Sequence, residues 1–241
     1  MNIRLFTIPN MLTLGNLLSG AVAAIFALQY HDYQVAFYLV VLAAVFDFLD
    51  GFAARLLKQS SPLGVQLDSL ADDVTFGLVP ALVMFDLYKN TSSYYGCGCV
   101  AMEYLGYLTL IIAAFSVLRL AKFNIDTTQS AEFAGLPTPA NALLLMSLAM
   151  LVQRGDLVLY QEHVLVISVV MSLLLISPIR MFALKFKGFG WRGNELRYIF
   201  ILVSVAIIIL KPAYSVPAII VLYIAVSTLR WLFGKRAEEL K

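Results

Sequence analysis

Long apolar stretches, separated by short polar or Pro- and Gly-containing breaks, follow one another along almost the whole chain. A stretch of about 20 apolar residues is long enough to cross the hydrocarbon core of a bilayer as a helix. The pattern therefore predicts an all-α polytopic membrane protein, with residues 1–241 forming one integral-membrane domain. We expect about eight transmembrane helices, near residues 8–29, 34–57, 64–88, 102–122, 136–153, 157–177, 196–211 and 213–233.

The overall composition supports this prediction. Hydrophobic residues make up 61% of the chain, charged residues only 13%, and the mean hydropathy is +0.86. These values exclude an ordinary soluble domain. The first residues contain no small-residue cleavage site that leads into a soluble domain, so we do not expect a cleaved signal peptide. The formal net charge of +2 says little by itself. We expect no nucleic-acid partner.

The positions of the Lys and Arg residues predict the orientation. If the N-terminus lies in the cytoplasm, all but three of the 17 basic residues fall on the cytoplasmic side; the exceptions are Lys89, Arg154 and Lys211. Short cytoplasmic loops of membrane proteins carry such an excess of positive charge. We therefore expect both termini in the cytoplasm, in a multi-pass protein of the cell's inner membrane.

The segment from Asp47 to Asp73 carries five aspartates within two of the predicted spans. Asp47 and Asp50 are three residues apart and Asp68 and Asp72 are four apart, so each pair shares one face of its helix. Both pairs lie roughly 6–12 Å from the cytoplasmic helix ends, at 1.5 Å per residue. The connection between the spans is short, so the helices are antiparallel and we expect the two pairs to face each other. Asp73 is about 100° round from Asp72 and should point elsewhere.

Four facing carboxylates need a positive partner at this depth. A single charge at the bilayer centre costs on the order of 2.5–3.5 kcal/mol, and repulsion between like charges adds to that cost. Two divalent cations balance four carboxylates, and a set of oxygen ligands favours Mg²⁺ or Mn²⁺, with Ca²⁺ also accepted. Two other interpretations remain open here: solvated aspartates at the membrane interface, and an acidic cation or proton pathway.

Small residues accompany the acids. Gly51, Ala54 and Gly64 allow a backbone or a ligand to approach closely, and Arg55 is placed where a phosphate or nucleotide could meet it. Elsewhere, Cys97 and Cys99 form a Cys-x-Cys pair without two further ligands nearby, which we interpret as an incidental loop pair.

The acidic segment resembles the signature of the CDP-alcohol phosphotransferase family. That signature reads Asp-x-x-Asp-Gly-x-x-Ala-Arg, eight residues, then Gly-x-x-x-Asp-x-x-x-Asp. All fixed positions are filled here, by Asp47, Asp50, Gly51, Ala54, Arg55, Gly64, Asp68 and Asp72. Several other segments look like the phosphatidylserine synthase branch of the family: Ile8–Gly20, Leu70–Ala81, Arg119–Asp126, Phe133–Ala140 and Pro178–Phe189.

The resemblance implies transfer of a phosphatidyl group from CDP-diacylglycerol to the hydroxyl of L-serine, giving phosphatidylserine and CMP. It implies that the four signature aspartates hold two divalent ions and that Asp72 also acts as general base. It implies a binding site for CDP-diacylglycerol at Asn10, Thr13, Gly51, Ala54, Arg55, Ser61 and Gly64. Members of the family are commonly homodimers, so the resemblance also implies a homodimer.

The residues that recognise the second substrate are less sharply marked. Arg119 and Lys122 are candidates for the serine carboxylate, with Asn124 beside them; as an alternative, both cations are ordinary anchors at the cytoplasmic interface. The signature also leaves open glycerol phosphate or inositol phosphate as acceptor. A cation or proton transporter is the more distant alternative; such a protein would be expected to show inverted repeats or interrupted helices, and none is evident in the sequence.

Overall fold

The computed structural model describes residues 5–96, 100–126, 132–182, 190–191 and 194–239, so Cys97 and Cys99 lie outside the described residues. The α-helices are α1 (Ile8–Tyr30), α2 (Tyr33–Leu56), α3 (Pro62–Asp72), α4 (Val79–Asn90), α5 (Val100–Leu105), α6 (Ile111–Ile125), α7 (Thr138–Gln153), α8 (Gln161–Ile176), α9 (Glu195–Leu210) and α10 (Ser215–Glu239). The remaining elements are a π-helical segment η1 (Asp73–Leu78), the 3₁₀ segments η2 (Gly106–Leu110) and η3 (Pro212–Tyr214), and the strands β1 (Glu132–Ala134) and β2 (Arg180–Phe182).

Each of the predicted apolar stretches contains a helix, which confirms the all-α polytopic prediction. Within the described residues, four helical stretches are long and apolar enough to cross a membrane, namely Ile8–Tyr30, Tyr33–Leu56, Gly106–Ile125 and Pro212–Phe233. Helices α7 and α8 are apolar but shorter. The chain is therefore a multi-pass membrane protein.

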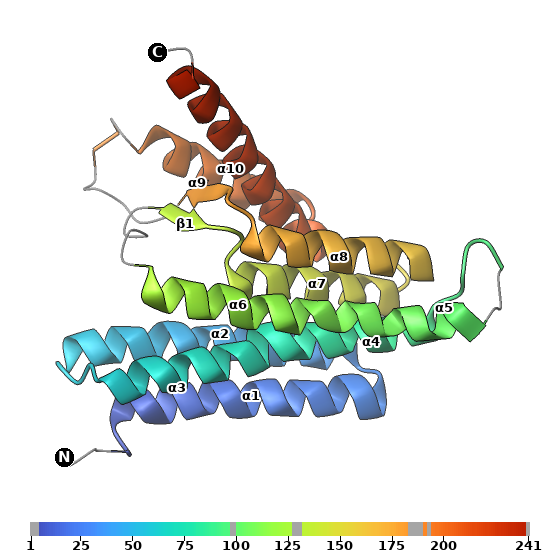
Figure 1. The fold of residues 1–241 in the computed structure, drawn as a ribbon, viewed down its shortest axis with the longest axis horizontal. Helices are drawn as coiled ribbons and strands as arrows, with labels where there is room; N and C mark the ends of the chain where they lie inside the picture. Colours follow the sequence, from blue (N-terminus) through green and yellow to red (C-terminus); the bar gives the residue numbers. More distant parts are fainter. Residues whose placement is uncertain (1–4, 97–99, 127–131, 183–189, 192–193, 240–241) are drawn as a thin grey trace.

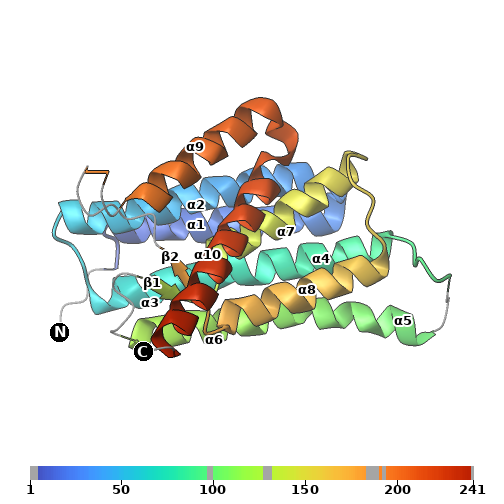
Figure 2. The ribbon, with the colours of Figure 1, turned by 90° about the horizontal axis from the view of Figure 1, so that it is seen from above.

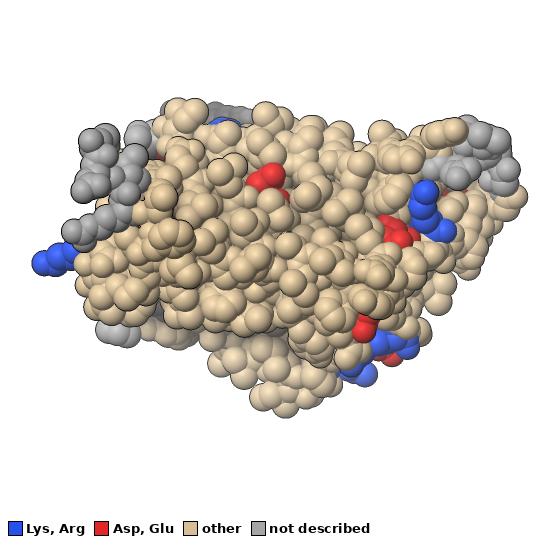
Figure 3. Space-filling view, turned by 90° about the horizontal axis from the view of Figure 1, so that it is seen from below, with Lys and Arg blue, Asp and Glu red and all other residues tan. Residues whose placement is uncertain are grey.

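Helices α1, α2, α3, α4, α6, α7 and α8 run along the long axis of the molecule, and α9 and α10 lie across them (Figure 1; Figure 2). Helices α1 and α2 pack along their length as an antiparallel hairpin. The start of α1, the turn between α2 and α3, and the end of α10 all lie toward one end of the long axis. We call this the α2–α3 end, and the opposite end the α1–α2 end. Figure 3 shows one face with few charged side chains, most of them near its two ends, which suits a lipid environment.

The predicted third span is one continuous helical stretch, but it is not regular throughout. Segment η1, of six residues, widens the helix between α3 and α4. Such π-helical turns are rare and often lie at functional sites, and the apolar pattern did not predict this one. Helix α6 approaches η1 closely, since a methyl group added at Gly77 would lie 2.6 Å from Ser116 Oγ.

A short antiparallel strand pair also escaped prediction. Strands β1 and β2 pair with Phe133 opposite Met181, between the ends of α6 and α8 and beneath α10. Gly135 follows β1 with φ +81°, and a methyl group there would lie 2.1 Å from the carbonyl oxygen of Leu175. Only glycine fits this close backbone crossing.

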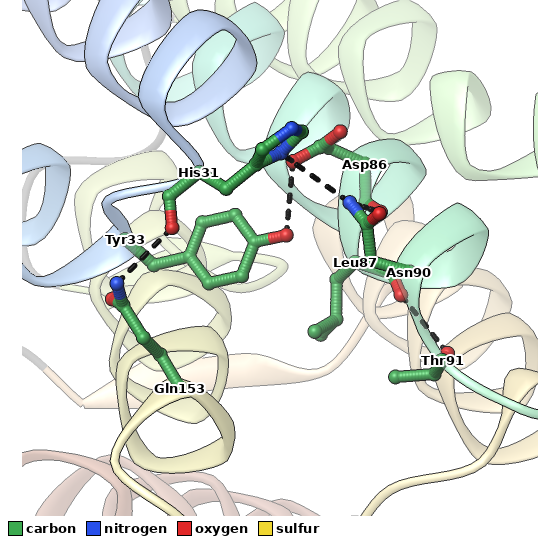
Figure 4. A network of polar contacts seen from close by, with 7 residues as sticks. All are labelled: His31, Tyr33, Asp86, Leu87, Asn90, Thr91 and Gln153. Carbon is green, nitrogen blue, oxygen red and sulfur yellow. Dashed lines mark hydrogen bonds and ion pairs between the residues drawn. The ribbon is translucent and has the colours of Figure 1, made fainter.

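At the α1–α2 end, a polar network ties three helices together (Figure 4). The buried Asp86 of α4 accepts a hydrogen bond from the hydroxyl of Tyr33 at 2.9 Å, and its Oδ2 lies 2.7 Å from His31 Nδ1. Gln153, at the end of α7, donates to the carbonyl of His31 at 3.0 Å. The network, which we call the far-end network, therefore fixes the α1–α2 turn against α4 and α7.

Candidate functional site

Three aspartates meet at the α2–α3 end. Oxygen atoms of Asp47, Asp50 and Asp68 all lie within 4.8 Å of one another. The first two share a face of α2, being three residues apart. The third is brought opposite them by the tight start of α3, where Ser61 caps the helix by accepting from the Gly64 amide at 3.0 Å. We call these residues the acidic triad.

The acidic triad fits a divalent cation. Three carboxylates this close repel one another unless a positive charge lies among them. Oxygen Oδ1 of Asp68 is buried and has no hydrogen-bond partner among the described residues, an unusual state for a buried polar atom. A set of carboxylate oxygens suits Mg²⁺, Mn²⁺ or Ca²⁺. The triad can therefore hold a divalent metal ion.

The fourth signature aspartate lies to one side of this triad. Asp72 does not join the set of oxygens within 4.8 Å. It is buried, and its Oδ1 accepts a hydrogen bond from Asn16 Nδ2 at 3.0 Å. The sequence predicted two equivalent facing pairs, whereas the structure has three carboxylates together and one held by α1. The side chain of Asp73, as its helical position predicted, faces α6 at Ser116.

Helix α1 supplies polar groups to both acid-bearing helices. Thr13 Oγ1 donates to Asp50 Oδ2 at 2.5 Å, and Asn16 reaches Asp72. Asn10 is also buried, and its Nδ2 donates to the carbonyl of Leu5 at 2.8 Å. These three side chains recur every third residue and so share one face of the helix.

A small cavity of about 120 Å³ opens between α1, α2 and α3 beside the triad. The predicted lipid-binding residues Asn10, Thr13, Gly51, Ala54, Ser61 and Gly64 all line it, together with Pro9, Asp50, Gln59, Ser60, Val65 and Asp68. A methyl group at position 64 would lie 3.3 Å from Ser61 Oγ and 3.4 Å from Asn10 Oδ1, so it would occupy part of this space. We call this space the α1–α3 cavity.

Arg55 does not line the cavity. Its side chain is exposed at the end of α2, and its Nη1 would lie 3.6 Å from a methyl group placed on Gly51. The guanidinium is therefore beside the mouth of the α1–α3 cavity, where a flexible cation can turn toward an anionic group.

The candidates for the second substrate separate into buried and exposed residues. Arg119 of α6 is 8% exposed, and its Nη1 donates to Thr138 Oγ1 at 3.3 Å. It interacts electrostatically with Asp72, and its Nε has no hydrogen-bond partner among the residues described. Lys122 is exposed and, with Arg119, lines a second cavity of about 290 Å³. Asn124 is exposed and bonds Ser69 Oγ at 2.8 Å.

Two buried asparagines were missed by the sequence reasoning. Asn16 is fully buried on the same face of α1 as Asn10 and Thr13, and that spacing was a signal that could have found it. Asn141 is fully buried one turn after Thr138, and neither of its side-chain polar atoms has a partner within the described part of the chain. The amide of Asn141 within an otherwise apolar helix was a signal that could have found it.

The chain is similar in sequence to known proteins over most of its length. A family model described as CDP-alcohol phosphatidyltransferase matches residues 6–175. A CDP-diacylglycerol–serine O-phosphatidyltransferase of Helicobacter pylori is 30% identical over 233 residues, covering 95% of this chain and 92% of that protein. Proteins with the same name from Bacillus subtilis and Saccharomyces cerevisiae are 35% and 36% identical, over 59% and 52% of this chain and 75% and 45% of their own lengths.

Proposed function

This chain belongs to the CDP-alcohol phosphatidyltransferase family, and we propose that it transfers the phosphatidyl group of CDP-diacylglycerol to the hydroxyl of L-serine. The products are phosphatidylserine and CMP. The observation that carries the proposal is the meeting of the acidic triad with the α1–α3 cavity, where two triad residues form part of the cavity wall. The similarity to serine-specific relatives along almost the whole chain supports serine as the acceptor.

The α1–α3 cavity binds the CDP end of the lipid. It lies at one end of membrane-length helices, at the depth where a lipid presents its headgroup while its acyl chains stay in the bilayer. The cavity is lined by hydroxyl and amide groups of Thr13, Ser61 and Asn10 and by backbone exposed at Gly51 and Gly64. Arg55, beside the mouth, turns toward the diphosphate.

Asp47, Asp50, Asp68 and Asp72 hold two divalent ions, Mg²⁺ or Mn²⁺. The close oxygens of the triad and the unpartnered Oδ1 of Asp68 support this assignment. When bound, such ions neutralise the diphosphate and the charge that develops on the departing CMP.

Asp72 is the general base. The serine hydroxyl is a weak nucleophile until a base takes its proton. Asp72 accepts that proton, the serine oxygen forms a bond to the lipid-side phosphorus, and the bond from that phosphorus to the CMP oxygen breaks. Its position beside the triad, with one oxygen held by Asn16, supports this separate role.

Arg119 binds the serine carboxylate, with Lys122 and Asn124 nearer the surface. A buried guanidinium with an unpartnered Nε and a neighbouring aspartate base is suited to a small anionic acceptor. Lys122 adds a second positive charge to the wall of the cavity that it lines together with Arg119. Asn124 contacts α3 through Ser69.

The enzyme lies in the cell's inner membrane as a homodimer, with its active site and both termini facing the cytoplasm. The excess of Lys and Arg at one side supports the orientation. The α2–α3 end, which holds the acidic triad, also holds the start of α1 and the end of α10.

One assay tests the proposal. Purified protein receives CDP-diacylglycerol and Mg²⁺ or Mn²⁺, then serine, glycerol 3-phosphate or inositol phosphate in separate reactions, and CMP is measured. We expect CMP with serine. Absence of CMP with every acceptor would overturn the enzymatic proposal, and CMP with only a phosphorylated acceptor would overturn the choice of serine.

A further inference from the structure

We propose that Asn16 is a positioning residue for Asp72: it holds one oxygen of that carboxylate so that the other faces the acceptor hydroxyl. This inference rests on the proposed function, because it assigns how the base of that reaction is oriented. It concerns a residue outside the aspartate signature, on a different helix.

The contact is direct and fully enclosed. Asn16 has no solvent-exposed surface, and its Nδ2 lies 3.0 Å from Asp72 Oδ1. An amide nitrogen can only donate, so the bound oxygen of Asp72 must accept. A donated bond to a buried carboxylate is among the stronger hydrogen bonds in proteins. Asn16 therefore fixes which oxygen of Asp72 is occupied.

The backbone around Asn16 is held against the π-helical segment that follows Asp72. Thr75 of η1 donates through Oγ1 to the carbonyl oxygen of Asn16 at 3.3 Å. One turn further along α1, a methyl group on Gly20 would lie 3.0 Å from Thr75 Cα, so the two backbones touch at this point. The close contact between α1 and η1 therefore fixes the backbone from which the Asn16 side chain reaches Asp72.

The contact also fixes the orientation of the carboxyl group. With Oδ1 of Asp72 held by the Asn16 amide at 3.0 Å, the carboxyl plane keeps one direction relative to α1. This matters because catalytic geometry tolerates little misplacement.

Helix α1 makes a second hydrogen bond of the same kind to another signature aspartate. Three residues before Asn16, Thr13 donates to Asp50, a member of the acidic triad. One polar face of α1 therefore orients a metal-site carboxylate with Thr13 and the base with Asn16. A change at Asn16 should accordingly affect the chemical step more than the binding of the lipid.

The test replaces Asn16 by Leu, which has the same branched shape and no donor, and by Ala. Ser19→Ala is the matched control, because Ser19 lies on the same helix and its hydroxyl, among the described residues, bonds its own helix at the Gly15 carbonyl. For each protein we would measure kcat and KM for serine, KM for CDP-diacylglycerol, the affinity for Mn²⁺ and the thermal midpoint in detergent. Outer contacts of this kind typically change activity by roughly 10- to 100-fold.

We expect kcat with serine to fall by roughly 10- to 100-fold in Asn16→Leu and Asn16→Ala. We expect the KM for CDP-diacylglycerol to stay close to the wild-type value, and Ser19→Ala to behave like the wild type. Wild-type kcat in a folded Asn16 variant would overturn the inference. So would a loss shared equally by kcat, lipid KM and thermal midpoint, because that pattern belongs to a merely structural residue. If the wild-type protein releases no CMP at all, the proposed function is wrong. If the wild-type protein releases CMP and the Asn16 variants do so at the same rate, only the role of Asn16 is wrong.

Discussion

At the scale of single residues, the acidic site shows how one residue type acquires different surroundings. Asp47, Asp50 and Asp68 share a small volume, Asp72 is held by an amide, and Asp73 faces another helix. These carboxyl groups are chemically identical, so any difference in their roles must come from their different neighbours.

The proposed role of Asp72 as general base can be tested separately from lipid binding. Replacing it by Asn keeps its size and removes its ability to take a proton, so we expect turnover to be abolished while CDP-diacylglycerol still binds. The check is CMP release together with lipid binding to the same preparation, using Asp73→Asn as a neighbouring control with most of the wild-type activity. Turnover at the wild-type rate in Asp72→Asn would contradict the assignment of the base.

Part of this residue-scale picture could be predicted from the sequence. The spacing of Asp47 and Asp50, and the short connection to Asp68, were enough to predict facing acids, and the angular offset of Asp73 predicted its separate direction. The distinct position of Asp72 was not predictable, because it depends on Asn16, which lies 56 residues away in the chain. Pairing between distant helices is not encoded in the periodicity of either helix.

At the scale of elements, the lengths of the apolar stretches predicted where the helices lie. They did not predict irregular turns within a helix. The apolar pattern predicted a helix across residues 64–88 and gave no sign of the π-helical turn at Asp73–Leu78. The strand pair β1–β2 likewise involves two short segments whose pairing is set by the surrounding helices. Both features are decided by tertiary packing, which overrides local propensity.

The crossing of α1 and η1 gives an element-scale prediction. Gly20→Ala would place a methyl group 2.3 Å from Thr75 Oγ1 and 3.0 Å from its Cα. Overpacking of this kind typically costs about 1–3 kcal/mol, so we expect a lower thermal midpoint and reduced activity. Gly15→Ala on the same helix is the control, since its methyl group would meet the Phe46 ring at an ordinary 3.4 Å. Equal thermal midpoints for the two variants would contradict a tight crossing at Gly20.

At the scale of the whole molecule, the two ends of the bundle have different tasks. The α2–α3 end contains the acidic triad and its cavity. The far-end network at the α1–α2 end joins α2 to α4 through the buried Tyr33–Asp86 hydrogen bond, and joins the α1–α2 turn to α7 through the exposed Gln153–His31 hydrogen bond. This network lies a full helix length from the acids, so it should contribute to stability without taking part in the reaction.

Tyr33→Phe tests that division. The change removes the hydroxyl that donates to Asp86 at 2.9 Å and leaves a buried acceptor with one partner fewer, which typically costs about 1–3 kcal/mol. We expect a lower thermal midpoint with kcat and both KM values unchanged at a temperature where the protein is folded. Tyr38→Phe, at an exposed position on the same helix, should leave both readouts unchanged. A selective loss of kcat in Tyr33→Phe would instead link the far-end network to catalysis.

The acidic triad, Asp72 and the α1 side chains that contact them all precede residue 73, on the first three helices of the chain. Membrane proteins are made and inserted from the N-terminus onward, so these helices enter the bilayer while the later ones are still being synthesised. The carboxylates can therefore gather before Arg119 is synthesised. Under the proposed function, the order of synthesis would build the lipid-binding part of the site first, and would add Arg119, the proposed contact for serine, later.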